Sequence, residues 1–423
     1  MRMAKDLKVY RYGAGESVLI GTLASNGSFS YAESFAANPD NLPVSVSLPI
    51  RNEAFAPAEA EPFFEGLVPE GAARTLMASE LHVREDDWLA MLSSCGLDCV
   101  GDLLITAGSF PEPPAFEPVS TAELKGLFSR RASMAELNGS DRLSLAGTQS
   151  KVGLAHVPNE PLVDGWMRAK NCAASTHILK VGSHDRLTGI EYLCTSAAAR
   201  CGIDSARVDL LDFGVPVLCS ERFDRICWSN GGGGPNALQV TRLHQEDMAQ
   251  AFAIGSRSKY VELEGGSLSA IARLLREESD DAIADIRRLA KLICFNYAIG
   301  NCDAHLKNFS LLYGEHWDTV RLAPAYDLVC TTWFEDLSRS MAMAINGVWD
   351  IDCIRAEDFR ACAGDFGLSE KAFAAVAHEV AESVDEAVLA AASEVGERFE
   401  DVAWDAEALL EDIAPRKLAL SRV

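Results

Sequence analysis

The sequence has no run of about 18 apolar residues, the length that a helix needs to cross a membrane. Its first six residues lead into polar sequence rather than an apolar stretch, which argues against a signal peptide. Basic residues are scarce, since 38 Lys and Arg stand against 62 Asp and Glu and give a net charge of −24. A phosphate backbone would repel such a chain. Direct nucleic-acid binding is therefore disfavoured, and a basic partner is favoured.

Paired cysteine motifs are also missing. No Cys-x-x-Cys pair occurs among the 12 cysteines, and the Cys302 and His305 spacing has no second pair to complete a zinc site. The cysteines are scattered, many in apolar surroundings such as those of Cys194 and Cys294. This usage predicts buried, reduced thiols and a cytoplasmic protein.

The 423 residues exceed the roughly 250–300 at which single cores begin to divide, so we expect at least two subdomains with a cleft between them. Strands are predicted near residues 7–10 and 18–20, and a helix at residues 88–92. Four prolines within residues 108–118 indicate a linker, and a helix is expected at 121–131.

A second β-rich zone is predicted at residues 143–224, and the pattern becomes helical from Leu243 onward. This order favours an α+β, two-lobed fold with a β-rich N-terminal lobe and an all-α C-terminal lobe. The expected parts are residues 1–120, a nucleotide-binding β-rich part at 121–240, and a helical lobe at 241–423 that carries the catalytic and metal-binding loops.

The sharpest chemical signal lies between Gly300 and Leu311. Asp303 and Asn308 are five residues apart, the spacing of a kinase catalytic loop, in which the aspartate receives the substrate's hydroxyl proton and the asparagine holds magnesium. A polar turn that joins a helix to a strand is the plain alternative. Asp327 lies in an apolar run just after a proline, where a bound cation would offset the cost of burying a carboxylate. The alternative there is a carboxylate that caps a backbone amide.

Three weaker signals precede this loop. Lys180 lies in a predicted strand, where a lysine can contact the ATP phosphates or simply extend to solvent. Residues 142–152 are not a Walker loop, but Gly147, two hydroxyls and Lys151 could cover phosphates; a β-turn with a surface lysine is the alternative. Residues 219–225 follow an apolar run and could form the connector that binds adenine. The order of flap, lysine strand, connector, helices, Asp-x4-Asn and metal aspartate is that of a protein-kinase-like core.

This combination resembles the HipA family of kinase toxins from type II toxin–antitoxin modules over nearly the whole chain. The matching segments are Ser-Val-Ser-Leu-Pro at 45–49, Pro-Phe-Phe-Glu-Gly-Leu at 62–67, Asp-Cys-Val-Gly at 98–101, Ser-Leu-Ala-Gly-Thr-Gln-Ser-Lys at 144–151, Glu-Arg-Phe-Asp-Arg at 221–225, His-Gln-Glu-Asp at 244–247, and residues 301–308.

The resemblance implies a role for each matching residue. Asp303 is the catalytic aspartate, and Asn308 and Asp327 are the magnesium ligands. The residues that the resemblance assigns to ATP binding are Lys151, Lys180 (also catalytic), Glu221, Phe223, His305 and Asn308. Ser144 matches an autophosphorylated serine whose modification expels the flap and inactivates the kinase. Ser150 stands where many members carry glutamate, so either Ser144 or Ser150 could be the modified hydroxyl.

The resemblance further implies a non-specific serine/threonine protein kinase that uses ATP and Mg²⁺. Its expected substrate is a protein, with an aminoacyl-tRNA synthetase as the family precedent. Its expected partner is a HipB-like helix-turn-helix antitoxin, through which alone it would reach DNA. Two alternatives remain open. A small-molecule or lipid kinase shares the short Asp-x-His-x-x-Asn form, although a lipid kinase should carry a basic surface. A non-catalytic pseudokinase corepressor is the other.

Overall fold

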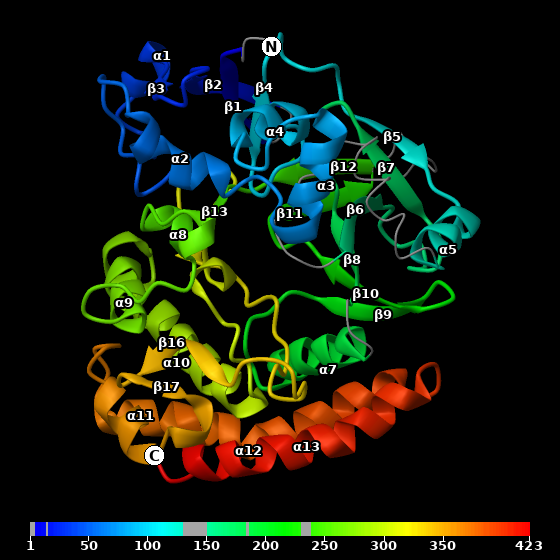
Figure 1. Ribbon diagram of the computed structural model, residues 1–423, viewed down its shortest axis with the longest axis vertical. Coiled ribbons are helices and arrows are strands. Elements are labelled where there is room, and N and C mark those ends of the chain that lie inside the picture. Colours follow the sequence, from blue (N-terminus) through cyan, green and yellow to red (C-terminus); the bar gives the residue numbers. More distant parts are fainter. Residues whose placement is uncertain (1–4, 14–15, 130–149, 183–185, 230–237) are drawn as a thin grey trace. The chain divides into compact units, whose positions relative to one another are not determined.

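The computed structural model describes residues 5–13, 16–129, 150–182, 186–229 and 238–423 (Figure 1). The chain forms two compact units and passes between them several times. Unit 1 comprises Met1–Ser183, Leu211–Ser258 and Leu312–Asp318. Unit 2 comprises His184–Leu210, Lys259–Leu311 and Thr319–Val423.

The first sheet of unit 1 is antiparallel and has the strand order β3-β2-β1-β4. Its strands are β1 (Leu7–Gly13), β2 (Glu16–Leu23), β3 (Phe29–Tyr31) and β4 (Leu103–Thr106). Leu7 and Val9 are buried and alternate with more exposed neighbours, which is the period of a half-buried strand. The helices of this part are α1 (Glu33–Ala36), α2 (Pro57–Glu65), α3 (Gly71–Leu81) and α4 (Trp88–Cys95). The two strands and the helix predicted here are confirmed.

The second sheet of unit 1 has the strand order β5-β7-β6-β8-β10-β9. Its strands are β5 (Ala115–Pro118), β6 (Ser150–His156), β7 (Trp166–Lys170), β8 (His177–Val181), β9 (Val208–Asp212) and β10 (Pro216–Glu221). One face of this sheet packs against α5 (Thr121–Ser129). The shared core contains Leu127 and Phe128 from the helix and Leu179 and Val217 from the strands. Unit 1 also contains β11 (Arg225–Ser229), β12 (Leu238–Arg242), β13 (Gln245–Asp247), α8 (Met248–Ala251) and the 3-10 turn η2 (Ser256–Ser258).

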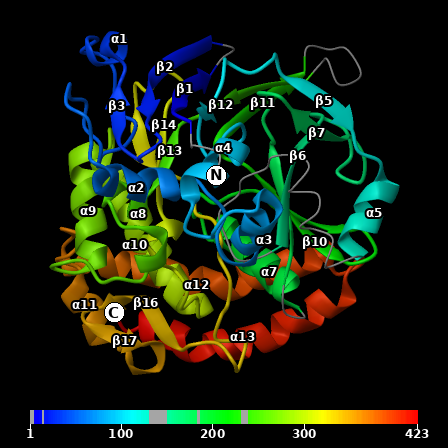
Figure 2. The same ribbon diagram turned by 45° about the horizontal axis from the view of Figure 1, so that its top comes forward.

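Unit 2 is mainly helical. Its helices are α7 (Leu187–Arg200), α9 (Ser267–Glu278), α10 (Ala282–Ile299), α11 (Ala356–Cys362), α12 (Glu370–Val395) and α13 (Glu400–Leu420). The long helices α12 and α13 lie side by side in both views and pack against α7 and α10 (Figures 1 and 2). Short elements connect the helices: η3 (Leu306–Asn308), β14 (Ser310–Tyr313, whose second half belongs to unit 1), β15 (Val320–Leu322), β16 (Ser340–Ile345), β17 (Val348–Asp350) and η4 (Ile351–Cys353).

Three local expectations differ from the structure, and a fourth is confirmed as far as the described residues reach. The region expected to be helical from Leu243 onward also contains the short strands β13 to β17. The zone predicted as β-rich contains the 14-residue helix α7. Twelve consecutive residues of α7 are buried, and they include the polar residues Thr188, Glu191 and Thr195, so burial in this helix does not follow polarity. The predicted linker ends in strand β5, which pairs with β7. The helix expected at 121–131 is described over Thr121–Ser129, because residues 130–149 lie outside the described part of the chain.

The cysteines carry no disulfide in the structure. Ten of the twelve are buried as predicted, whereas Cys227 is partly exposed and Cys353 is exposed. Among the described residues, no helix combines the length and the apolar character that a membrane crossing requires.

Candidate active site

The loop that carries Asp303 begins where α10 ends. Gly300 takes a left-handed conformation with φ of +75° at the helix C-terminus. A Cβ at this position would lie 2.0 Å from Thr332 Oγ1, so glycine is required by both conformation and space. The next residues are held in turn: Cys302 N donates to Thr331 Oγ1 at 2.8 Å, and Thr331 Oγ1 donates to the Gly300 carbonyl at 3.0 Å. The backbone just before Asp303 is thus fixed from both sides.

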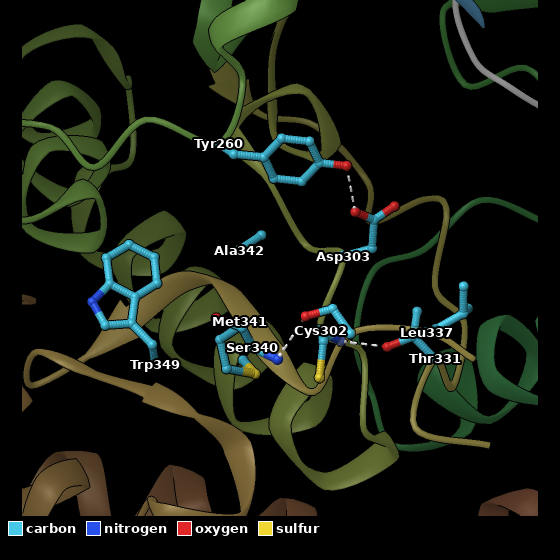
Figure 3. A pocket seen from close by; sticks show the side chains of 10 residues that line it. Tyr260, Cys302, Asp303, Thr331, Leu337, Ser340, Met341, Ala342 and Trp349 are labelled. Carbon is cyan, nitrogen blue, oxygen red and sulfur yellow. Dashed lines mark hydrogen bonds between the residues drawn. The ribbon is translucent and has the colours of Figure 1, made fainter. Parts of the chain in front are cut away.

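Asp303 is exposed, although its neighbours Cys302 and Ala304 are buried. Its backbone amide donates to Asn301 Oδ1 at 3.1 Å. The Tyr260 hydroxyl donates to Asp303 Oδ1 at 2.7 Å, as Figure 3 shows. The Tyr260 ring also meets the His305 ring edge-on, with centroids 5.1 Å apart. A solvent-accessible carboxylate on a fixed backbone is suited to accept a proton from an incoming hydroxyl.

Asn308 and Asp327 are brought together as the sequence predicts. Asn308 Nδ2 donates to Asp327 Oδ2 at 3.1 Å, and Asn308 Oδ1 accepts from the His305 backbone amide at 3.1 Å. The Tyr326 hydroxyl donates to the Lys307 carbonyl at 2.7 Å, which ties the two segments together. Asp327 has a φ of +59°, a left-handed conformation that a residue other than glycine keeps only where its surroundings fix it.

Asp327 and Asn308 carry oxygen atoms that could act as magnesium ligands, and in this structure Asn308 turns Nδ2 toward Asp327 and Oδ1 toward the His305 amide. Among the described residues, no group of three or more His, Cys, Asp or Glu side chains could hold a metal by itself. Magnesium, however, is usually held by one or two protein oxygens, with phosphate oxygens and water completing its octahedron. One carboxylate and one amide oxygen on adjoining segments supply that partial ligand set.

In unit 1, Lys151 on β6 lies directly opposite Lys180 on β8 in the antiparallel register. The cross-strand partner of Lys180 on its other side is Leu218 of β10. The alternate residues Leu179 and Val181 point into the hydrophobic core, so both lysines lie on the opposite face of the sheet. Two ammonium groups on the same face of neighbouring strands could both contact an anion such as a nucleotide phosphate.

The predicted connector places its side chains differently from the strand that carries Lys180. Glu221 is the last residue of β10, and it lies opposite His177, on the face away from Lys180. Phe223 follows in the turn before β11. The Arg222 amide donates to the Thr176 carbonyl at 2.9 Å, so the connector is tied to the lysine strand through the backbone.

The charged residues of the same motif are buried in an ion-pair network. Arg222 Nη2 and Arg225 Nη1 both donate to Asp224 Oδ2 at 2.8 Å, and the Gly101 amide donates to that same oxygen at 2.8 Å. Asp98 lies 3.5 Å from Arg225 Nη2. Burial alone would raise the pKa of Asp224, but Arg222 and Arg225 hold it well below its usual value. This part of the Glu-Arg-Phe-Asp-Arg motif is therefore architectural.

The His-Gln-Glu-Asp motif is also built into the interior of unit 1. Glu246 accepts from the Ser45 hydroxyl at 2.5 Å, from the Val46 amide at 3.0 Å and from the Tyr313 hydroxyl at 2.7 Å. Burial raises the pKa of Glu246 despite these donors. His244 Nδ1 lies 3.0 Å from Asp102 Oδ1. These contacts join residues 45–46 and Asp102 to His244 and β13.

The structure groups the predicted site residues by unit. Lys151, Lys180, Glu221 and Phe223 belong to unit 1, and Asp303, His305, Asn308 and Asp327 belong to unit 2. Ser144 lies outside the described residues. Tyr260 was missed by sequence reasoning, because its contact with Asp303 spans 43 residues and no motif surrounds it.

Comparison with known proteins shows to which family the chain is similar. The HipA-like C-terminal domain matches residues 143–388, and the HipA N-terminal domain matches residues 14–106. The protein Y4mE of Sinorhizobium fredii is 35% identical over 75% of each chain. The serine/threonine-protein kinase toxin HipA of Shewanella oneidensis is 25% identical over 88% of this chain and 86% of that protein.

A comparison of the fold with solved structures also finds a HipA protein. The HipA structure from Shewanella oneidensis MR-1, solved with HipB and operator DNA, matches with a TM-score of 0.77 at 23% identity. That match covers 98% of this chain and 96% of the other. The protein is thus of the two-lobed, protein-kinase-like α+β class, as predicted. Within that class the chain belongs to the HipA family, because the family's domains and its relatives cover most of the sequence.

Proposed function

We propose that this protein is a serine/threonine protein kinase that transfers the γ-phosphate of ATP to a hydroxyl of a protein. The observation that carries the proposal is the arrangement in unit 2, where exposed Asp303 follows a fixed turn and the Asn308–Asp327 pair adjoins the same loop. Kinase chemistry needs a group that accepts the hydroxyl proton and oxygen ligands for a phosphate-bound cation. This loop supplies both.

In this proposal Asp303 receives the proton of the acceptor hydroxyl, and Asn308 and Asp327 hold magnesium. Bound magnesium would neutralise charge on the phosphates. Lys180 and Lys151 bind the phosphates from their shared face of the second sheet, the backbone of the connector at Glu221 and Phe223 binds the adenine, and His305 contributes to the nucleotide site. The position of the two lysines on one face of neighbouring strands supports this assignment, because both ammonium groups can then contact one polyphosphate.

The proposed physiological role is that of a toxin paired with a small, basic helix-turn-helix antitoxin. Two observations support it: the net charge of −24, which suits a basic partner, and the relative whose structure was solved with HipB and operator DNA. DNA would be reached only through that antitoxin, and the proposed location is the cytoplasm. The proposed target is an aminoacyl-tRNA synthetase, on the precedent of the family.

Self-inactivation by autophosphorylation at Ser144 is part of the proposal. A phosphate adds about −1.5 to −2 charges at pH 7, which would repel the ATP phosphates and drive the flap outward. Mass spectrometry after incubation with ATP tests this step. Phosphate at Ser144, together with weakened nucleotide binding, is expected in the intact protein and not in Asp303→Gln. Phosphate confined to Ser150 would assign the step to the other hydroxyl.

The decisive test of the kinase proposal is phosphoproteomics after brief induction, comparing the intact chain with Asp303→Gln. We expect growth arrest and new protein phosphoserine or phosphothreonine with the intact chain only. Labelled ATP with lipid extracts and with protein substrates then separates a lipid kinase from a protein kinase. Equal phosphoproteomes for the two chains, with magnesium-dependent nucleotide binding retained, would contradict the proposal and favour a non-catalytic corepressor.

A further inference from the structure

A cavity of about 500 Å³ lies beside Asp303 within unit 2 (Figure 3). Its volume falls in the range of roughly 300–1,000 Å³ that is typical of pockets for small organic groups. Its walls come from β16, β17 and the segments around Tyr260, Cys302 and Thr331. The ten lining residues are Tyr260, Cys302, Asp303, Thr331, Leu337, Ser338, Ser340, Met341, Ala342 and Trp349. None of them was singled out from the sequence except Asp303 and Cys302.

The chemistry of the lining favours an apolar occupant. Leu337, Met341, Ala342, Trp349 and the ring of Tyr260 form the larger part of the wall, and Asp303 is the one charged side chain among the ten lining residues. Trp349 is 37% exposed, a large apolar surface that a partner could cover. Among the ten lining residues, no positive charge is present for a phosphate, and Asp303 is the one opposite charge for a cationic side chain.

The cavity is fixed relative to Asp303. The Ala342 amide donates to the Cys302 carbonyl at 2.8 Å, so β16 is hydrogen-bonded to the residue that precedes Asp303. Cys302 is also held by Thr331, and Tyr260 is held at the rim by its hydrogen bond to Asp303 (Figure 3). The segment before β16 is anchored by Arg339, which bonds both oxygens of Asp352 at 2.6 and 2.7 Å. A group seated in this cavity would therefore be held at a set distance from the carboxylate.

We propose that this cavity binds an apolar side chain of the substrate polypeptide, close in sequence to the serine or threonine that is phosphorylated. The inference rests on the proposed function, because it needs the acceptor hydroxyl to lie at Asp303. An extended chain advances about 3.3–3.6 Å per residue. A residue one to three positions from the acceptor therefore reaches a cavity that Asp303 itself lines. Met341, Ala342 and Trp349 are specificity-determining residues in this view, and the backbone contacts of β16 set the spacing.

The test uses the full-length protein with labelled ATP and magnesium. The substrates are peptides with one serine in an alanine–glycine background, in which leucine, phenylalanine, lysine or glutamate is placed in turn at each of the three positions on either side. Casein, mapped by mass spectrometry, serves as a general protein substrate. Three variants are compared: Ala342→Phe fills the cavity, Trp349→Ala opens its wall, and Trp404→Ala is the control. Trp404 is 66% exposed on α13 and does not line the cavity.

With the intact protein and with Trp404→Ala, leucine or phenylalanine at one fixed position should raise kcat/KM by on the order of tenfold to a hundredfold, the range of a hydrophobic pocket. Ala342→Phe should abolish that preference, and Trp349→Ala should weaken it, while nucleotide affinity and circular dichroism match the intact protein. A misfolded Ala342→Phe would leave Trp349→Ala as the deciding variant.

The failures are distinguishable. If the intact protein phosphorylates casein or peptides but shows no apolar preference, or keeps it in both cavity variants, the cavity does not bind the substrate and the kinase proposal stands. A preference for lysine or glutamate would likewise overturn the apolar assignment. If the intact protein phosphorylates neither peptides nor casein, and the phosphoproteomes of the intact chain and Asp303→Gln are also equal, the kinase proposal fails and the cavity inference fails with it.

Discussion

The aspartates in the sequence motifs of unit 1 and unit 2 differ in their exposure to solvent. In unit 1, Asp224 is 2% exposed and accepts hydrogen bonds from Arg222, Arg225 and the Gly101 amide. In unit 2, Asp303 and Asp327 are exposed, although the residues on either side of Asp303 are buried. The first carboxylate is enclosed by its own chain, and the other two face outward from a rigid support.

The difference in burial indicates different roles for the two sets of aspartates. We expect Asp224 to stabilise the fold, and Asp303 and Asp327 to take part in the proposed reaction. A carboxylate surrounded by two arginines and a backbone amide cannot exchange those partners without leaving charges unpaired in the interior. An exposed carboxylate on a fixed backbone can accept a proton or a cation at little cost. Mutations should therefore separate the two sets, with activity lost and stability kept in unit 2, and the reverse in unit 1.

The largest effect is expected for Asp303→Asn. Removing a general base should lower phosphoryl transfer by on the order of 10²–10⁴-fold. Nucleotide binding should persist, because Lys180, Asn308 and Asp327 are untouched, and the urea midpoint should stay unchanged because the side chain is exposed. Full turnover by Asp303→Asn would remove this residue from the mechanism.

Asp327→Asn should instead weaken magnesium-dependent nucleotide binding.

Asp224→Asn should lower the stability of unit 1, whereas the residues proposed for catalysis are left unchanged. Removing one partner of a buried ion pair costs about 3–5 kcal/mol, because Arg222 and Arg225 would remain buried with too little negative charge. Urea denaturation followed by circular dichroism measures the loss. Asp86→Asn is the matched control in unit 1, since Asp86 pairs with Arg84 at the surface, and it should change stability little. A stable Asp224→Asn protein would show that the network is not architectural.

A smaller effect is expected at His177, on the strand that carries Lys180, where the stability of the folded protein should depend on pH. Burial, together with the neighbouring His156, lowers the pKa of His177 from 6.5 to about 4. The unfolded chain then binds the proton first as the pH falls. The stabilising effect of the neutral ring is fully present above pH 6.5 and is lost between pH 6.5 and 4, by up to about 3 kcal/mol.

Chemical denaturation at pH 7 and at pH 5 checks this dependence. His177→Gln should reduce the loss of stability between the two pH values. His378→Gln, which replaces an exposed histidine on α12, should keep it. An equal pH dependence in both variants would mean that another group is responsible.

The smallest effect is expected for Tyr260→Phe. The variant keeps the ring that lines the cavity and removes only the hydroxyl that donates to Asp303 at 2.7 Å. A hydrogen bond between exposed groups is worth little, so kcat should fall by about threefold to tenfold through looser positioning of the carboxylate. Peptide KM and nucleotide affinity should not change. A rise in KM with unchanged kcat would instead make Tyr260 a substrate-binding group.

Local patterns in the sequence were sufficient where an element has two different faces. Strands β1 and β2, helix α4 and a helical segment from about Glu370 to Leu410 were predicted from the local sequence, and the structure contains each of them. Helix α7 was missed, and it buries polar residues such as Thr188, Glu191 and Thr195 together with its apolar ones, so its polarity does not show which residues are buried. The Asp-x4-Asn spacing was informative because one short loop has to carry both groups.

The sequence by itself determined the family, the α+β class and the segments that hold Asp303, Asn308 and Asp327, since these depend on residues near one another in the chain. Only the tertiary structure decided that Arg222, Asp224 and Arg225 are enclosed in an ion network, that Lys151 faces Lys180, and that Tyr260 bonds Asp303 beside an apolar cavity. Burial and long-range contacts decide these roles. A residue's type and near neighbours do not reveal how many partners the folded chain will bring to it.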